Sequence, residues 1–428
     1  MENLSLALEE RTIRKVKYRV LPLVFAIYLV AFLDRANVAY AKLTMSADLG
    51  FSEKVYGFGA GLFFIGYLVL EVPGALIVQR WGARRWISRI LASWGVCTAI
   101  VGLIHSANQF LAARFLLGLA EAGLVPGVLV YLNAWFPVQH RARALTRFFI
   151  ASPVALMIGG PIAGVILRLN WGGIAGWRWV FILEGVPALI LAIVCLTAMS
   201  DRPQDASWLE ADERDWLVNA LETERRQETV VRHLSVWQVL RRREVLLLSA
   251  ITFLVNIGIA GFFLWLPSNV RSHSGLSPSV AAALSGIPYA VTVAIELALS
   301  YSSDRTGERR LHSAVPLLLA AVVFPVTTLG GLNLASFVFW LCLSAAAIYG
   351  YTPAYWTLPS LTLKDTAGAA AYGFLNLFGA MGSFIGPSVV GTMLTRGIPF
   401  SRAVLFLSAC FLIGGICALR IQVPAPSG

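Results

Sequence analysis

The sequence is poor in charged residues. Only 13% of its 428 residues are Asp, Glu, Lys or Arg, whereas 57% are hydrophobic and the mean hydropathy is +0.72. Soluble domains usually carry about 25% charged residues, and a water-soluble fold has too little interior to hide this much apolar surface. This shortage excludes an ordinary soluble protein and indicates a chain that crosses a membrane several times.

Cysteine and histidine are also scarce, with five of each. All five cysteines lie inside apolar runs and none has C-x-x-C spacing, so we expect neither a disulfide framework nor a zinc site. The histidines are scattered, and the sequence has no nucleophile elbow or phosphate-binding loop. We therefore expect no metal, no cofactor and no enzymatic activity.

Long apolar runs fill most of the chain. About 20 mostly apolar residues cross the core of a bilayer as a helix, and the sequence predicts twelve such spans. The first apolar run starts at Val20, is too long for a signal peptide and is expected to be retained as the first span. The predicted spans are 19–43, 54–79, 86–106, 109–136, 142–167, 177–199, 244–270, 278–302, 312–331, 334–360, 367–395 and 400–421.

Basic residues are distributed unevenly between the loops. When alternate loops are assigned to opposite sides, the side with both termini holds 25 of the 34 Lys and Arg residues, and the other holds 7. The positive-inside rule places both termini in the cytoplasm. The same clustering explains the net charge of +11 without a nucleic-acid partner.

Two short motifs occur twice at nearly the same spacing. "QRWGARR" at 79–85 returns as "DRTGERR" at 304–310, and the Gly-Pro of "GGPIAG" at 159–164 returns in "IGPSVV" at 385–390. We interpret this repeat as duplication of a six-span half. Six spans give both halves the same orientation, as in transporters whose bundles rock about a central site. The predicted units are an N-terminal bundle (1–200), a cytoplasmic linker (201–243) and a C-terminal bundle (244–428).

The linker is polar and is predicted to contain an amphipathic helix. Ser207 followed by Glu210 is a capping-box signature, and "RRR" at 241–243 anchors the seventh span at the membrane surface. We interpret this segment as a tether between the two bundles.

Four ionisable side chains interrupt the first and fourth spans. Asp34 and Arg35 adjoin in "LVAFLDRANVAYA", and Arg114 and Glu121 lie seven residues apart on one helix face. Each charge near a helix centre costs about 2.5–3.5 kcal/mol, so we expect all four to face protein or a wet cavity, and to converge. Arg35 and Arg114 would bind an organic anion, while Asp34 and Glu121 would exchange protons. The alternative is that each acid only neutralises an arginine and holds the helices together.

Weaker candidates for the binding pocket are aromatic and amide side chains in apolar spans, where such residues otherwise serve packing or the membrane interface. They are Tyr28, Tyr67, Trp265, Tyr355, Trp356 and Asn376. Glu71, Glu184 and Glu296 also lie within spans, and the sequence leaves their roles open.

The repeated R-x-G-x-R-R loops are predicted to form a tight turn and a charge latch between adjacent helices. Membrane anchoring explains the arginines but not the repeated glycine. We expect the latch to stabilise the outward-open state as a cytoplasmic gate and not to touch substrate. Its residues are Arg80, Gly82, Arg84 and Arg85 in the first copy, and Asp304, Arg305, Gly307, Arg309 and Arg310 in the second.

These loops resemble the major facilitator superfamily signature, G-x-x-x-D-R-x-G-x-R-R, although Gln79 replaces the acid in the first copy and weakens any charge relay there. Over nearly its whole length the chain is similar to the anion:cation symporter family. The similarity rests on "FLDRANVAYAKLTM", "GYLVLEVPGALIVQRWGARRW", "RFLLGLAEAGLVPGVLVYLNAWFP" and "GWRWVFILEGVPA". The run from Asp34 to Met45 looks most like the tartrate, phthalate and hydroxyphenylacetate members.

The resemblance implies twelve transmembrane helices in two pseudo-symmetric six-helix bundles, and proton-coupled uptake of a small organic anion such as a sugar acid, tartrate or an aromatic carboxylate. It implies proton sites at Asp34 and Glu121, substrate contacts at Arg35 and Tyr67, coupling at Arg114 and a polar contact at Asn376. We expect a monomer in the bilayer of a bacterial inner membrane, with protons and the anion as partners. An antiporter or efflux carrier is the open alternative.

Overall fold

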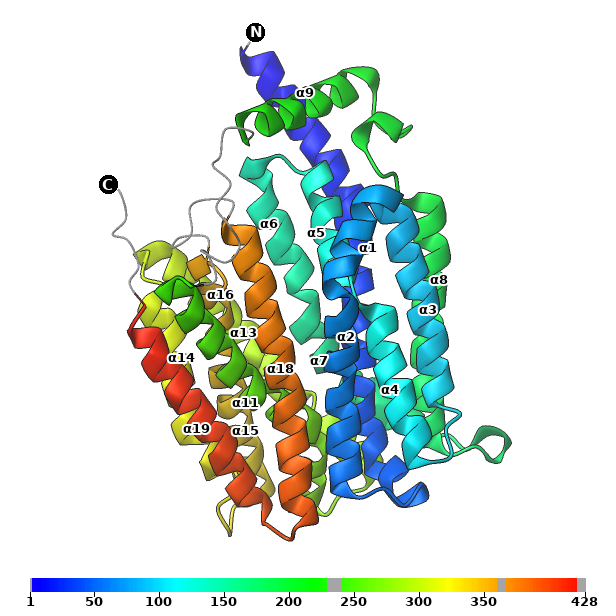
Figure 1. Cartoon of the computed structure of the whole chain (residues 1–428), viewed down its shortest axis with the longest axis vertical. Helices are drawn as coiled ribbons and strands as arrows, with labels where there is room; N and C mark the ends of the chain where they lie inside the picture. The colour runs from blue at the N-terminus through cyan, green and yellow to red at the C-terminus, as the bar shows by residue number, and fades with distance from the viewer. Residues whose placement is uncertain (1, 229–240, 360–366, 422–428) are drawn as a thin grey trace.

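A computed structural model of the chain describes residues 2–228, 241–359 and 367–421. This part of the chain contains helices and no β-strand, which confirms the predicted all-helical fold. Figure 1 shows most helices running side by side along the long axis of the molecule. We call the end where α1 begins and α9 lies the terminal face, and the opposite end the distal face.

The N-terminal bundle contains eight helices. The first is longer than predicted because the charged segment before Val20 continues directly into the first span. The predicted fourth span is broken directly after Glu121, and the predicted fifth span begins early and is broken at Ile150. The helices are α1 (Glu2–Asp48), α2 (Glu53–Trp81), α3 (Ala83–Val101), α4 (Ala107–Glu121), α5 (Leu124–Trp135), α6 (Val138–Phe149), α7 (Ala151–Ile166) and α8 (Gly176–Ala198).

The C-terminal bundle also contains long and broken helices, and the two bundles share a break in the fourth span. Its second and fourth spans are each divided into a short and a long helix. The helices are α11 (Arg243–Ser274), α12 (Pro278–Leu284), α13 (Ile287–Thr306), α14 (Arg310–Val326), α15 (Leu334–Gly350), α16 (Thr352–Tyr355), α18 (Ala367–Thr395) and α19 (Phe400–Leu419).

Ten helical stretches of the described chain are long and apolar enough to cross a membrane. Helix α14 is apolar but shorter, and α3 carries three arginines, Arg84, Arg85 and Arg89, in its first two turns. Together with these two helices, the described chain has a helical stretch at each of the twelve predicted spans.

Equivalent helices pack together in the two bundles. In the N-terminal bundle α2 packs on α4, α3 on α8, and α1 on α7. In the C-terminal bundle their counterparts pair in the same way, with α13 on α15, α14 on α19, and α11 on α18. This correspondence is the pseudo-symmetry expected from the internal sequence repeat.

The two bundles meet closely at the distal face. The glycines Gly57 and Gly61 of α2 leave no room for a side chain between α2 and residues 384–391 of α18. In the same way Gly160 and Gly164 of α7 lie against α12 and the residues that follow it. Small residues let helix backbones approach closely in membranes, so this face is sealed by backbone packing.

Helix α9 (Ala211–Glu228) lies on the terminal face and is held to α1 by ion pairs. Arg11 pairs with Asp212 at 2.5 Å, and Lys15 pairs with Glu210 at 2.9 Å and with Glu213 at 2.8 Å. The predicted capping box at Ser207 and Glu210 is wrong by three residues. The helix starts later, and the Glu213 carboxylate accepts the backbone N–H of Glu210 at 3.1 Å.

Candidate functional site

Arg35 and Glu121 form a direct ion pair between α1 and α4. The Arg35 Nε donates to Glu121 Oε1 at 2.8 Å, and Arg35 Nη2 lies 2.5 Å from the same oxygen. Glu121 is the last residue of α4, and the chain leaves helical geometry at Ala122 before α5 begins. The predicted convergence of the two spans therefore occurs at a break in a membrane helix, a common location for binding sites in transporters.

Aromatic rings surround the Arg35 guanidinium. Its central carbon lies 5.1 Å from the ring centroid of Phe32, 5.7 Å from that of Phe63 and 5.2 Å from that of Tyr67. These distances suit cation–π attraction. The rings hold a positive charge in place without neutralising it, and Tyr67 lies beside Arg35.

Asp34 points to a different side of α1 from Arg35. Its Oδ1 accepts a hydrogen bond from Asn37 Nδ2 at 3.0 Å, and the carboxylate lies within electrostatic range of Arg114. Arg114 is fully buried, and its Nε and Nη1 have no hydrogen-bond partner among the described residues. Its guanidinium carbon lies 5.0 Å from the Phe63 centroid, so Arg114 and Arg35 both lie near the Phe63 ring.

The four charges form one buried cluster, but they do not share one open chamber. Asp34, Arg114 and Glu121 are 1% exposed or less. The Arg35 side chain is 16% exposed. Arg35 is thus the member of the cluster that solvent or a solute reaches directly.

The C-terminal bundle contributes one polar contact beside this cluster. Asn376 of α18 donates through Nδ2 to Glu71 Oε1 of α2 at 3.3 Å, and Glu71 lies within electrostatic range of Arg35. This contact joins the two bundles and brings Asn376 close to the charged site. Tyr28 packs nearby against Phe32, Phe148 and Phe149.

Three predicted pocket residues have other surroundings. Trp265 packs edge-on against Tyr56, with ring centroids 5.2 Å apart, in the distal seal. The Tyr355 hydroxyl lies 2.6 Å from the Thr252 hydroxyl and 2.7 Å from the Leu248 carbonyl oxygen, within its own bundle. Trp356 stacks on Tyr372. These three side chains therefore have partners other than Arg35 in the structure.

Lys42, which is not among the predicted site residues, links the bundles at the distal face. Lys42 Nζ lies 2.9 Å from Glu53 Oε2 and 3.0 Å from Ser268 Oγ. It also lies 4.5 Å from the ring centroid of Trp265 and 5.1 Å from that of Tyr56. The signal in the sequence is a lysine one residue before the end of the predicted first span, a position typical of an ordinary interfacial anchor.

The two R-x-G-x-R-R loops form the predicted turns. Gly82 has φ +82° and Gly307 has φ +67°, a backbone region that favours glycine. In the first loop the Arg84 backbone N–H donates to Asp201 Oδ1 at 2.8 Å, and Arg84 Nε donates to the Leu196 carbonyl oxygen at 2.6 Å. Asp201 thus supplies an acid to the loop in which Gln79 occupies the signature position.

The second loop forms its latch with its own acid. Arg309 Nη2 lies 2.7 Å from Asp304 Oδ1, and Arg309 Nη1 donates to Ser303 Oγ at 2.8 Å. The remaining arginines of the two loops are exposed and form no ion pair within the described residues. They are Arg80, Arg85, Arg305 and Arg310. In both loops the bonds join helices of the same bundle.

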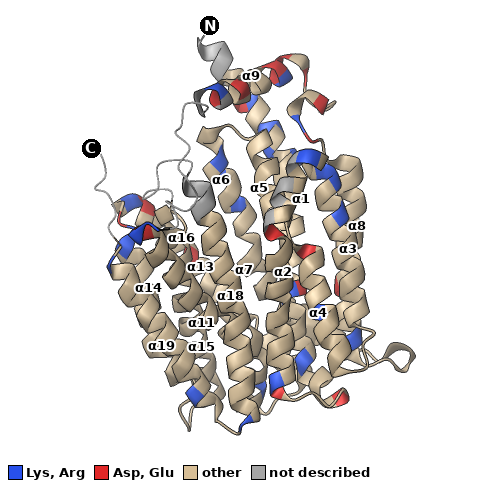
Figure 2. Ribbon diagram, viewed as in Figure 1, with Lys and Arg blue, Asp and Glu red and all other residues tan. Residues whose placement is uncertain are grey.

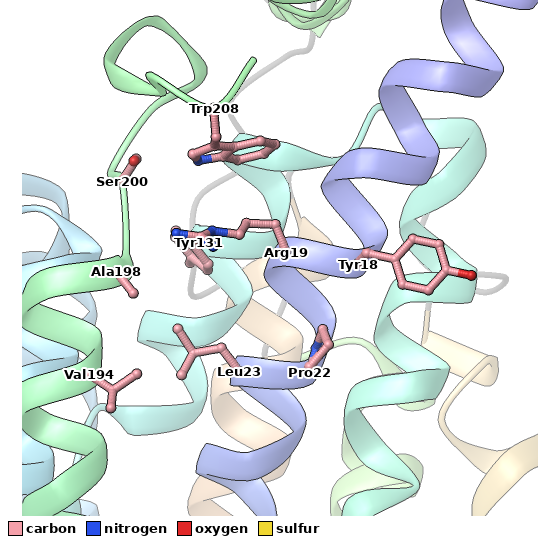
Figure 3. Close-up of a pocket in the computed structure, with 9 residues that line it drawn as sticks. All are labelled: Tyr18, Arg19, Pro22, Leu23, Tyr131, Val194, Ala198, Ser200 and Trp208. Atoms are coloured by element: carbon pink, nitrogen blue, oxygen red, sulfur yellow. The ribbon is translucent and has the colours of Figure 1, made fainter.

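A separate pocket of about 200 Å³ opens toward the terminal face. Figure 3 shows Arg19 extending from α1 toward Tyr131, with the Trp208 ring above it. Its walls come from α1, α5, α8 and the segment before α9, and none of its lining residues is a predicted site residue. Within the described chain, no three His, Cys, Asp or Glu residues gather as metal ligands would.

The charges as a whole are distributed as a membrane transporter requires. Figure 2 shows Lys and Arg gathered near the ends of the helices and few charged residues at mid-height, several of them beside α2 and α4. Two bundles around a buried charged site define a multi-pass membrane transporter of small molecules. The chain belongs to the Major Facilitator Superfamily, whose profile matches residues 24–387. It is therefore a transporter and not an enzyme.

Relatives of the chain are similar over nearly their full length. A protein of Agrobacterium vitis named "Putative tartrate transporter" is 36% identical over 420 residues, which cover 98% of this chain and 96% of that protein. The "Quinolone resistance transporter" of Acinetobacter baumannii is 36% identical over 417 residues, covering 95% and 94%. A bacterial homologue of the lysosomal transporter Spinster, solved in an inward-facing, unoccupied conformation, has a TM-score of 0.79 at 18% identity and covers 96% of this chain and 99% of that one.

Proposed function

We propose that the protein is a proton-coupled symporter that takes up a small organic anion, such as a sugar acid, tartrate or an aromatic carboxylate. One observation supports this most strongly. Arg35 is the accessible cation of an otherwise buried cluster, and its partner there is the titratable Glu121. A guanidinium fork matches a carboxylate, so the site favours an anionic solute, as the name of the tartrate relative suggests.

Competition for Arg35 would couple the proton to the anion. While Glu121 is ionised it occupies the Arg35 fork, as in this structure. Protonation of Glu121 weakens that pair and frees the guanidinium to bind the carboxylate of the substrate. Loss of the proton restores the pair and displaces the anion. Proton and anion would therefore bind together and leave together.

The orientation follows from the basic loops. The terminal face would lie in the cytoplasm of a bacterial inner membrane, because its loops hold most of the Lys and Arg residues. The sealed distal face would then be the outer side, so the conformation described here is closed outward and belongs to the release half of the cycle. We propose that the bundles rock as units in a monomer, joined by the linker that includes α9.

Transport in reconstituted liposomes tests this proposal. With an inward proton gradient and labelled tartrate, sugar acids or aromatic carboxylates outside, we expect uphill accumulation that a protonophore abolishes. Accumulation of none of these anions under the inward gradient would contradict the proposal.

A second candidate is a proton-driven efflux carrier. The relative named for quinolone resistance is as similar as the one named for tartrate, so the same scaffold serves differently named transporters. Exchange predicts that solute accumulates only under an outward proton gradient or against a trapped counter-solute. The direction of the gradient that drives accumulation therefore separates the two candidates.

A further inference from the structure

Glu184 is a buried acid that the proposed cycle does not use. It lies on α8, which packs mainly on α3 and α1. Glu184 is only 8% exposed, and neither of its carboxyl oxygens has a hydrogen-bond partner within the described chain. The carboxyl group faces Asn37 and Asp34 of α1.

Asn37 also has a buried polar atom without a hydrogen-bond partner among the described residues. It is completely buried, and its Nδ2 donates to Asp34 Oδ1 at 3.0 Å, whereas its Oδ1 receives no hydrogen bond from the described residues. An ionised carboxylate is a pure acceptor and cannot satisfy another acceptor. A carboxylic acid carries one O–H donor, so a protonated Glu184 would satisfy Asn37 Oδ1 and avoid a buried charge without donors.

We propose that Glu184 holds a resident proton and positions the Asp34 carboxylate through Asn37. The Glu184 O–H donates to Asn37 Oδ1, which fixes the orientation of the amide so that Nδ2 points at Asp34. Glu184 is then a positioning residue that keeps its proton, whereas Asp34, like Glu121, is a group that exchanges protons. This assignment rests on the proposed function and deepens it, because Asp34 is the second carboxyl group of the proton-exchanging cluster.

The other groups around the pair leave this arrangement undisturbed. Asp34 also faces Arg114 of α4 and, on α3, Trp94, Thr98 and Cys97. Glu184 has Tyr40 of α1 as a further titratable neighbour, and α7, which also touches α8, carries no titratable side chain. No cation among these groups faces Glu184 directly, so no ion pair favours its charged form.

Infrared difference spectroscopy of the purified full chain tests the resident proton. The spectrum of the wild type minus that of Glu184→Gln should contain the carbonyl band of a protonated carboxylic acid. That band should persist from acidic to neutral pH and shift in deuterated water. A carboxylate difference band at neutral pH would overturn the proposal, because Glu184 would then be ionised.

The positioning role is tested through the protonation of Asp34. The carbonyl band that Asp34→Asn removes is titrated in three backgrounds, namely Glu184→Ala, Asn37→Leu and the two combined. Loss of the Asn37 bond to a carboxylate should move the pH at which Asp34 takes up its proton upward by about one to two units. The two single variants should shift it equally, and the double variant no further.

Conservative and control variants complete the test. Glu184→Gln offers an N–H to Asn37 Oδ1 and should return the Asp34 titration to its wild-type position. Thr197→Val, an exposed change on α8 whose hydroxyl bonds only to its own helix, should not move it. A shift in Glu184→Gln as large as in Glu184→Ala, or no shift in Glu184→Ala, would overturn the positioning role. None of these spectra requires transport, so they decide the inference even if proton-driven uptake is not observed.

Discussion

In the proposed cycle Arg35 binds two carboxylates in turn, that of Glu121 and that of the substrate. Arg35→Lys keeps the positive charge but replaces a planar fork with a point charge, so it cannot hold a carboxylate through two parallel bonds. We expect affinity for the anion to fall about tenfold to a hundredfold, since a hydrogen bond to a charged group contributes about 1.5–3 kcal/mol. Equilibrium binding of the labelled anion measures this. Arg14→Lys, outside the cluster, is the control, and unchanged affinity in Arg35→Lys would remove Arg35 from the binding site.

Glu121→Gln separates proton coupling from substrate movement. Gln keeps the size of Glu but cannot ionise, so it cannot reclaim Arg35 from the bound anion. We expect gradient-driven uptake to be abolished while exchange of labelled for unlabelled anion continues. Comparison of gradient uptake with counterflow in the same liposomes shows the split. If counterflow is lost as well, Glu121 has a structural role or contacts the substrate.

At the residue scale, the sequence predicted that the charges of the first and fourth spans lie close together, but it did not predict most of their neighbours. A charge within an apolar span must face protein or water, and this is why Asp34, Arg35, Arg114 and Glu121 could be expected to face the protein interior. Spacing along one helix does not reveal which neighbouring helix a side chain meets. The distal position of Trp265 therefore could not be predicted, and neither could the link through Lys42 or the contribution of Asp201.

At the element scale, the ion pairs between α1 and α9 predict that the docking of α9 on α1 depends on pH. Burial alone would raise the pKa of Glu213, but hydrogen bonds from Lys15 and the Glu210 N–H, with the charges of Lys15 and Arg11, hold it below its ordinary value of 4.5. The stabilisation from a lowered pKa is fully present above the ordinary value and is lost as pH falls through the lower one. The docking of α9 should therefore be constant near neutral pH and weaken below about pH 4.5.

The docking of α9 is measured through the mobility of a spin label at Asn219 on this helix. Its mobility should rise as the pH falls from 7 to below 4.5. Glu213→Gln should weaken docking about tenfold at neutral pH, because the charge-assisted bonds from Lys15 and Arg11 are lost. Asp215→Asn, on an exposed position of the same helix, should leave mobility unchanged. Equal mobility in wild type and Glu213→Gln at every pH would show that the ion pairs do not hold α9.

Hydropathy predicted where the spans lie along the chain, but not where the helices are interrupted or extended. The end predicted for the eleventh span, Thr395, coincides with the end of α18, because turn-forming sequence follows it. The break after Glu121 and the continuation of α1 before Val20 depend on local geometry and on the α9 contacts. Hydropathy records only whether a segment is apolar, so it carries no information about either feature.

At the scale of the whole molecule, the seal between the bundles combines a passive and a charged part. Glycines along α2 and α7 allow close backbone contact, which is the same in any state that brings these helices together. The charged part of the seal is Lys42, whose partners come from both bundles, with Glu53 on α2 and Ser268 on α11. The Arg271 guanidinium strengthens this seal by donating to the Leu43 carbonyl oxygen. Opening the distal face must therefore break charge-assisted bonds as well as packing.

Lys42→Met should shift the whole protein toward the state that is open at the distal face. Met fills a similar volume but forms neither the Glu53 ion pair nor the Ser268 hydrogen bond, and the loss of charge-assisted bonds should change the conformational equilibrium about tenfold or more. Spin labels at Lys54 and Arg402, both exposed at the distal face on opposite bundles, report the separation by pulsed electron resonance. We expect the longer distance to gain population in Lys42→Met and to stay unchanged in Arg168→Met, a distal control outside the seal. If both variants match the wild type, backbone packing alone closes this face and Lys42 is only an anchor.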